Sequence, residues 1–136
     1  MVALTEGRTT KKRELRVVNR QMLANAKIYE GSLAALTAAG YATPGAVSAT
    51  LKKPGLARAT VDNTGGANGA KSIEIEYGTF QFANSAAGDL IVIGDIGGTA
   101  YIVDDQTVAK TNGGATRSAA GEIVDVDAQG VWVKFA

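Results

Sequence analysis

The sequence contains neither cysteine nor histidine in its 136 residues. Without cysteine, disulfides and thiolate metal sites are excluded. Without histidine, the chain lacks the commonest general base, the usual partner of a serine nucleophile and the commonest transition-metal ligand. Carboxylates, lysines or tyrosines can still support catalysis, so these absences disfavour an enzyme without excluding one. We expect no catalytic residue, no metal site and no cofactor.

Aromatic residues and long apolar runs are also scarce. The large rings are one Trp, four Tyr and three Phe. A core of small aliphatic side chains buries little area per residue, so oligomerisation would help to stabilise it. No apolar run approaches the about 20 residues of a membrane span, and none resembles the core of a signal peptide. The sequence predicts a soluble protein, made in a cytoplasm, with no membrane partner.

Charge is distributed unevenly along the chain. Residues 1–61 carry ten Lys or Arg against three Glu (net +7), whereas residues 62–136 carry four against ten acids (net −6). Such asymmetry often indicates what a chain contacts. Residues 1–13 show neither helical nor strand periodicity, which predicts an extended basic arm before one folded domain over residues 14–136. Two interpretations of the arm stay open: a solvated, disordered tail, or a segment that orders on a neighbouring subunit.

The remainder of the chain predicts short strands separated by turns. A helix over residues 13–26 is an alternative, because several of its residues favour helix, but Val17 and Val18 make a poor helical centre. We predict an all-β fold, a small β-barrel or sandwich of short antiparallel strands. The expected strands and apolar runs cover residues 15–19, 26–29, 33–36, 40–45, 56–61, 72–82, 90–93, 99–103, 107–110, 122–127 and 131–135.

Local patterns add detail to this fold. Ile73 and Ile75 alternate with glutamates, which predicts a strand with one buried face, and Gly78 indicates a bulge in it. Residues 104–106 and 128–130 predict two hairpin turns. In the second hairpin we expect Val124 and Val126 on one face and Asp125 and Asp127 on the other. The run 90–93 is expected to be buried.

The acidic residues do not form a recognisable catalytic or metal motif. Residues 125–130 resemble the start of a calcium loop, but Ala136 stands where the required Glu would fall. Paired carboxylates can hydrolyse glycosides, yet the sequence offers few aromatic residues to line a sugar cleft. The glycine pairs lack the residues of phosphate-binding and dinucleotide-binding loops. These features therefore predict turns and solvated strand faces.

The basic arm could contact nucleic acid. Its five cations at positions 8, 11, 12, 13 and 16 suffice for a salt-dependent phosphate contact. However, the arm has no aromatic residue to stack on bases, and the acidic remainder of the chain would repel nucleic acid. A small nucleic-acid-binding module stays the alternative function, although an acidic protein surface fits the arm at least as well.

Several segments resemble small proteins encoded beside the major capsid gene in tailed phages, notably Mu-like ones. They are Ala3–Glu6 with its basic continuation, 27–31, 80–86, 98–110 and 118–127 leading to 131–133. The resemblance implies a head decoration (cement) protein that binds the outside of the expanded capsid and clamps neighbouring capsomers. It also implies location in the virion, the major capsid protein as partner, and self-association, with a trimer expected ahead of a dimer.

Two groups of residues are the predicted contact sites. The contacts of the arm with the capsid or a neighbour are assigned to Leu4, Thr5, Arg8, Lys11, Lys12, Arg13 and Arg16. An acidic surface that receives a neighbour's arm is assigned to Asp104, Asp105, Asp125 and Asp127. An arm can add as a strand to an exposed sheet edge, and many weak contacts repeated over a closed shell give high avidity.

Overall fold

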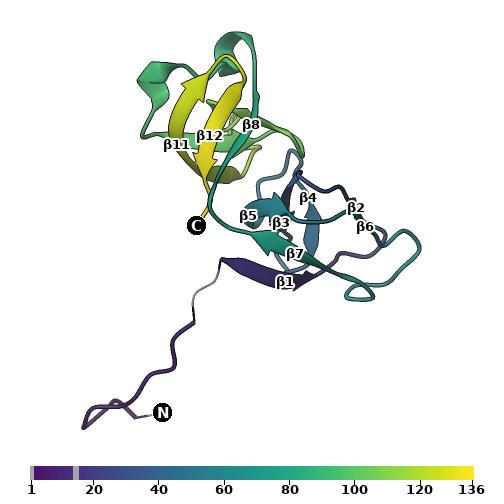
Figure 1. Ribbon diagram of the computed structural model, residues 1–136, viewed down its shortest axis with the longest axis vertical. Coiled ribbons are helices and arrows are strands. Elements are labelled where there is room, and N and C mark those ends of the chain that lie inside the picture. The colour runs from purple at the N-terminus through teal and green to yellow at the C-terminus, as the bar shows by residue number, and fades with distance from the viewer. Residues whose placement is uncertain (1, 14–15) are drawn as a thin grey trace.

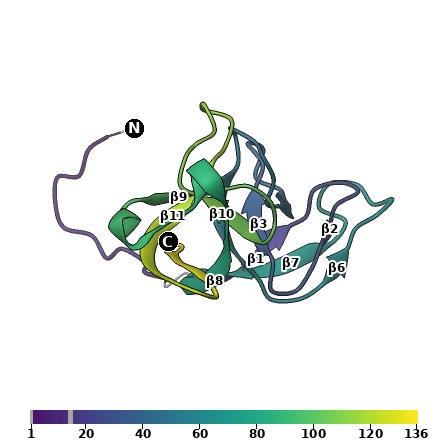
Figure 2. The ribbon, with the colours of Figure 1, turned by 90° about the horizontal axis from the view of Figure 1, so that it is seen from above.

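The computed structural model describes residues 2–13 and 16–136 and confirms the all-β prediction. The arm is followed by two β units (Figures 1 and 2). The first unit is a five-stranded antiparallel sheet in the order β1-β7-β5-β3-β4, beside a two-stranded sheet of β2 and β6. Its strands are β1 (Val17–Gln21), β2 (Lys27–Ile28), β3 (Leu33–Leu36), β4 (Ala42–Pro44), β5 (Lys52–Ala57), β6 (Val61–Asp62) and β7 (Ser72–Glu76).

The second unit is a closed barrel in the order β10-β8-β12-β11-β9. Four of its pairings are antiparallel, and a parallel pairing of β10 with β8 closes it. Two short 3-10 turns, η1 (Ala87–Asp89) and η2 (Ile93–Asp95), lie between β8 and β9. The strands are β8 (Thr79–Asn84), β9 (Thr99–Ile102), β10 (Thr107–Ala109), β11 (Ala119–Asp127) and β12 (Gly130–Lys134).

Several local predictions are confirmed. Ile73 and Ile75 are buried in β7 while Glu74 is exposed. The irregularity at Gly78 is the point where the chain leaves the first sheet, because β7 ends at Glu76 and β8 begins at Thr79. Both hairpins form, β9 with β10 and β11 with β12.

Other local predictions need correction. Residues 17–21 form a strand, so the helical alternative is wrong over them, and Leu15 of the predicted strand lies outside the described residues. The strand predicted over 56–61 is two strands, β5 and β6. Val124 does not share the inner face with Val126: a shift in the β11–β12 register after Ile123 leaves Val124 42% exposed and Val126 half-buried. A β-bulge changes which side chains face inward, and the sequence alternation alone gives no sign of it.

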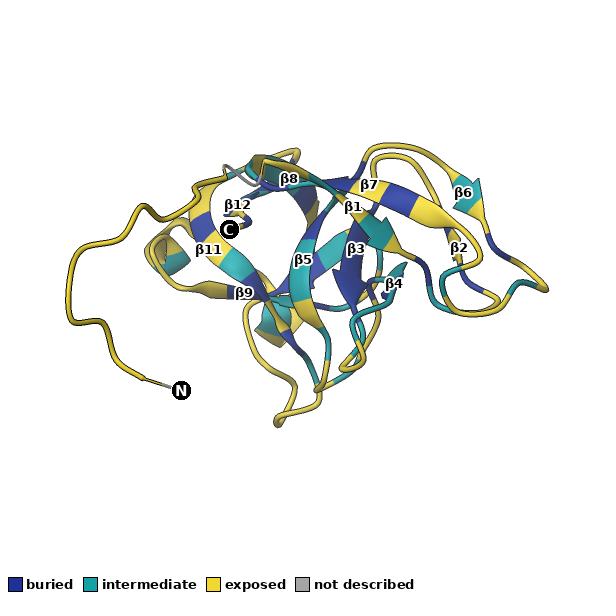
Figure 3. Cartoon of the chain, turned by 90° about the horizontal axis from the view of Figure 1, so that it is seen from below, coloured by how far each residue is buried: buried dark blue, intermediate teal, exposed yellow. Residues whose placement is uncertain are grey.

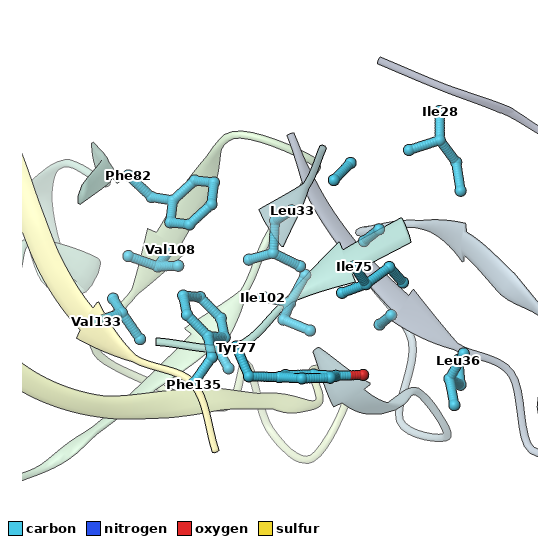
Figure 4. Packing of buried hydrophobic residues seen from close by; sticks show 14 of the residues in the cluster. Ile28, Leu33, Leu36, Ile75, Tyr77, Phe82, Ile102, Val108, Val133 and Phe135 are labelled. Atoms are coloured by element: carbon cyan, nitrogen blue, oxygen red, sulfur yellow. The ribbon is translucent and has the colours of Figure 1, made fainter. Parts of the chain in front are cut away.

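One cluster of buried side chains spans both units (Figures 3 and 4). Leu33 of the first sheet lies near Ile102 of the barrel, and the Leu33 N–H donates to the Asp105 carbonyl oxygen at 2.7 Å. A Cβ added to Gly45 would lie 2.8 Å from the Asp104 carbonyl oxygen, so only glycine permits this approach. Buried Ser118 accepts the Leu51 N–H at 3.0 Å and donates to the Ser48 carbonyl oxygen. The barrel uses residues 79–134, and the predicted boundary beside Glu14 lies outside the described residues.

Candidate functional site

The predicted contact residues of the arm are all exposed. Residues 2–13 run away from both β units (Figure 1), and Val2 and Leu4 are 92% and 69% exposed. The main chain of Arg16 belongs to the body, because its carbonyl oxygen accepts the Tyr77 N–H at 2.7 Å. The structure thus places Arg16 at the base of the arm, where its side chain is exposed beside the first sheet.

The structure does not bring the four predicted acidic residues together. In the β9–β11 pair, Ala119 lies opposite Tyr101 and Glu122 opposite Thr99. Asp104 and Asp105 follow β9 at one end of this pair, whereas Asp125 and Asp127 lie beyond its other end. Two separate acidic places result, one beside the first sheet and one on the far hairpin.

Asp127 is occupied by contacts within its own hairpin. Its carboxylate accepts the Trp132 indole N–H at 3.1 Å, the Gln129 N–H at 2.8 Å and the Gln81 amide at 3.0 Å. The indole hydrogen bond, followed by the Gln129 N–H, lowers the pKa of Asp127. This carboxylate holds the only Trp of the chain against the outer face of the barrel.

The other three predicted acids have fewer contacts. Asp104 accepts the Gln106 N–H at 2.9 Å and caps the β9–β10 turn, and Asp105 is half-buried beside residues 29–32. Asp125 is exposed and accepts only the N–H of Val126 among the hydrogen bonds of the described residues. Asp104 and Asp125 are thus both exposed carboxylates that accept one main-chain N–H each, and both keep capacity for a partner.

Sequence reasoning missed an exposed apolar surface at the rim of the barrel. The run 90–93 was expected to be buried, but only Ile91 is, at 1% exposure. We call the following exposed side chains the apolar patch: Leu90, Val92, Ile93, Ile96 and Val124, which are 42–76% exposed. Four of these side chains lie within residues 90–96, and Val124 follows Ile123, which bonds to Gly97 and Gly98. Large exposed apolar surfaces in soluble proteins commonly mark interaction sites.

The 87–97 loop, which carries most of the apolar patch, is held firmly from two sides. The Asn84 side chain forms two hydrogen bonds with the main chain of Ile91, accepting its N–H at 2.9 Å and donating to its carbonyl oxygen at 2.8 Å. At its end, Gly97 donates to the Ile123 carbonyl oxygen and Ile123 donates to that of Gly98, both at 2.8 Å. These two bonds place the loop beside Val124 on β11.

Ion pairs add to this support. Lys110 lies 3.5 Å from the Asp95 carboxylate, and Arg117 lies 3.2 Å from that of Asp89. A hydrogen bond from Thr111, then one from Arg117, lowers the pKa of Asp89. A shallow hollow of about 300 Å³ lies between this loop and β11, lined by Gly94, Asp95, Ile96, Gly98, Thr99, Lys110 and Ile123. The loop therefore presents its aliphatic side chains in a fixed arrangement.

Residues 2–13 and 16–136 contain no helix long and apolar enough to cross a membrane. In the same part of the chain, no three Asp or Glu residues are grouped so that they could hold a metal ion. Comparison of the chain with protein-family models, with curated proteins and with solved structures gave no significant match. The candidate sites are therefore the arm, the apolar patch and the exposed carboxylates near it.

Proposed function

We propose that this chain is a structural protein of a tailed-phage virion that decorates the outer surface of the expanded capsid and clamps neighbouring capsomers. The observation that carries the proposal is the arm: residues 2–13 are fully exposed, with apolar residues at the start and four cations after them, and they precede a folded β body. Its sequence resemblance to decoration proteins supports the same assignment.

The arm gains most by ordering on another surface. Fixing an extended residue costs about 1–2 kcal/mol of backbone entropy, which must be offset by new contacts. Main-chain hydrogen bonds to a strand edge and attraction of Lys11, Lys12 and Arg13 to acidic groups of a shell would supply them. Weak binding of each copy then suffices, because many copies act on one closed shell.

The body also offers an open strand edge. At the two ends of the β1–β7 pair, the Tyr77 N–H donates to the Arg16 carbonyl oxygen and the Met22 N–H donates to that of Lys71. In an antiparallel pair, every second residue bonds to the partner strand. The residues between, such as Val17 and Asn19, therefore point their N–H and C=O groups away from β7. Figure 1 shows β1 at the edge of the sheet, next to the base of the arm. A strand from the major capsid protein or from a second copy can add there. Self-association, as a trimer ahead of a dimer, is part of this proposal.

Capture by expanded capsids tests the proposal. Capsids assembled from the major capsid protein of the same phage should pull down the full chain, and deletion of residues 1–13 should abolish capture while circular dichroism still shows a folded β body. The matched variant Lys11→Glu, Lys12→Glu, Arg13→Glu keeps the arm's length and should reduce capture strongly. Undiminished capture of both variants would show that the arm is not the capsid contact.

The alternative function, a nucleic-acid-binding module, makes a different prediction. Its affinity for duplex DNA would be appreciable at low salt and would fall steeply toward physiological salt. A filter-binding series over salt concentration measures this directly. Absence of binding at low salt would eliminate the alternative.

A further inference from the structure

The arm and the apolar patch have complementary chemistry. Val2 and Leu4 are two residues apart, so in an extended segment their side chains lie on the same side. Four residues further along is Arg8, about 13 Å away at the rise of a strand. On this side the arm thus presents an apolar pair, then the carboxylate of Glu6, and then the cation of Arg8.

Around the apolar patch, apolar side chains lie next to carboxylates. Ile96 precedes Gly97, which bonds to Ile123, the residue before Val124, and η2, which contains Ile93, packs against β11. On the same strand are Glu122 and Asp125, both exposed. Neither forms an ion pair among the described residues, although Lys134 lies opposite Glu122 in the β11–β12 register. Apolar side chains bordered by carboxylates suit a segment that begins with apolar residues and carries one acid against four cations over residues 2–13.

The arm of a second copy is the occupant that this geometry favours. Within one chain, the arm runs away from the end of the barrel that carries the 87–97 loop (Figure 1), and both surfaces remain uncovered. Twelve extended residues span about 40 Å, which is enough to reach an adjacent molecule. Because the 87–97 loop is already ordered, only the arm has to lose conformational freedom on binding.

We propose that the apolar patch of one copy binds residues 2–8 of the arm of a second copy, with Val2 and Leu4 on the patch and Arg8 beside Glu122 and Asp125. Each copy gives one arm and receives one, so the contact is head-to-tail and can close into a ring. Lys11, Lys12 and Arg13 stay available for the shell. The contact goes beyond capsid binding and forms without capsids.

Cysteine crosslinking tests this directly, because the chain has no cysteine of its own. A full-length Leu4→Cys variant is mixed, under mild oxidation and without capsids, with a full-length Ile93→Cys variant of different mass. We expect the mixed disulfide dimer to exceed, by about tenfold, that formed with the control Val47→Cys, which is 55% exposed in the first unit; tenfold corresponds to 1.4 kcal/mol. Equal yields would overturn the proposal.

Two further crosslinking samples test whether something other than a second copy's arm covers the apolar patch. If the double variant Leu4→Cys, Ile93→Cys closes only within its own chain and the mixed dimer is absent, the arm covers its own patch and the proposal fails. If Ile93→Cys crosslinks only to itself, two patches meet face to face and the proposal also fails.

Charge reversal tests the polar part of the contact. Glu122→Lys with Asp125→Lys in the patch partner should lower the mixed-dimer yield several-fold, and Arg8→Glu in the arm partner should restore it. Failure of restoration would remove Arg8 from the contact. Since no capsid is present, these results are independent of whether the chain decorates one.

Discussion

The arm and the 87–97 loop both expose large aliphatic side chains, but the rest of the molecule holds only one of them in place. Val2 and Leu4 are exposed on a segment with no described contact to the body, whereas Ile93 is exposed on a loop anchored at Asn84, Lys110 and Ile123. A fixed apolar surface acts as a receptor, because little entropy is lost there on binding. A free segment acts as a ligand that orders on its partner.

The largest expected loss of stability distinguishes a buried from an exposed isoleucine within the 87–97 loop. Ile91→Ala removes the buried anchor of the loop, and we expect it to lower the free energy of unfolding by about 3 kcal/mol. Ile93→Ala, two residues away and 76% exposed, should change it by less than about 0.5 kcal/mol. Chemical denaturation measures both. Similar losses in the two variants would mean that Ile93 also supports the fold and is not a free docking residue.

A smaller loss is expected at the polar anchor. Asn84→Ala leaves the N–H and C=O of buried Ile91 without their partners, which should cost about 2 kcal/mol. Asn19→Ala, on the exposed face of the edge strand β1, is the matched control and should be nearly neutral. If the two variants unfold at the same denaturant concentration, the loop is not held by Asn84.

These contacts also show what the sequence can and cannot predict. The two hairpins and the alternation around Ile73 depend on neighbouring residues, so local turn chemistry and periodicity predict them. The clamp of Asn84 on Ile91 and the barrel closure by β10 and β8 join segments through the tertiary fold. The exposure of Leu90, Val92 and Ile93 follows from those tertiary contacts, which the local sequence does not reveal. The apolar run by itself therefore led to a prediction of burial. The prediction for Val124 was wrong for the same reason: the bulge after Ile123 belongs to the pairing of β11 with β12 and cannot be seen in the alternation of residues.

The smallest expected effect is a pH dependence of the Asp89 contacts that support the 87–97 loop. The pKa of Asp89 is lowered by Thr111 and then Arg117, so the stabilisation that they provide is complete above the unfolded value of about 3.9 and is lost as pH falls through the lower folded value. The NMR amide shift of Thr111, whose hydroxyl donates to Asp89, should therefore be constant down to about pH 4 and change below it. Asp89→Asn should remove this titration. A loop transition near neutral pH would contradict the role of Asp89.

The central claim is that this chain binds the outside of an expanded capsid through its arm. Electron cryomicroscopy of expanded capsids incubated with the full chain tests it most directly. The account predicts density for the two β units on the outer surface, with the arm extending from β1 onto the shell. Bare outer surfaces at saturating protein concentration, or density confined to the inner surface, would contradict it.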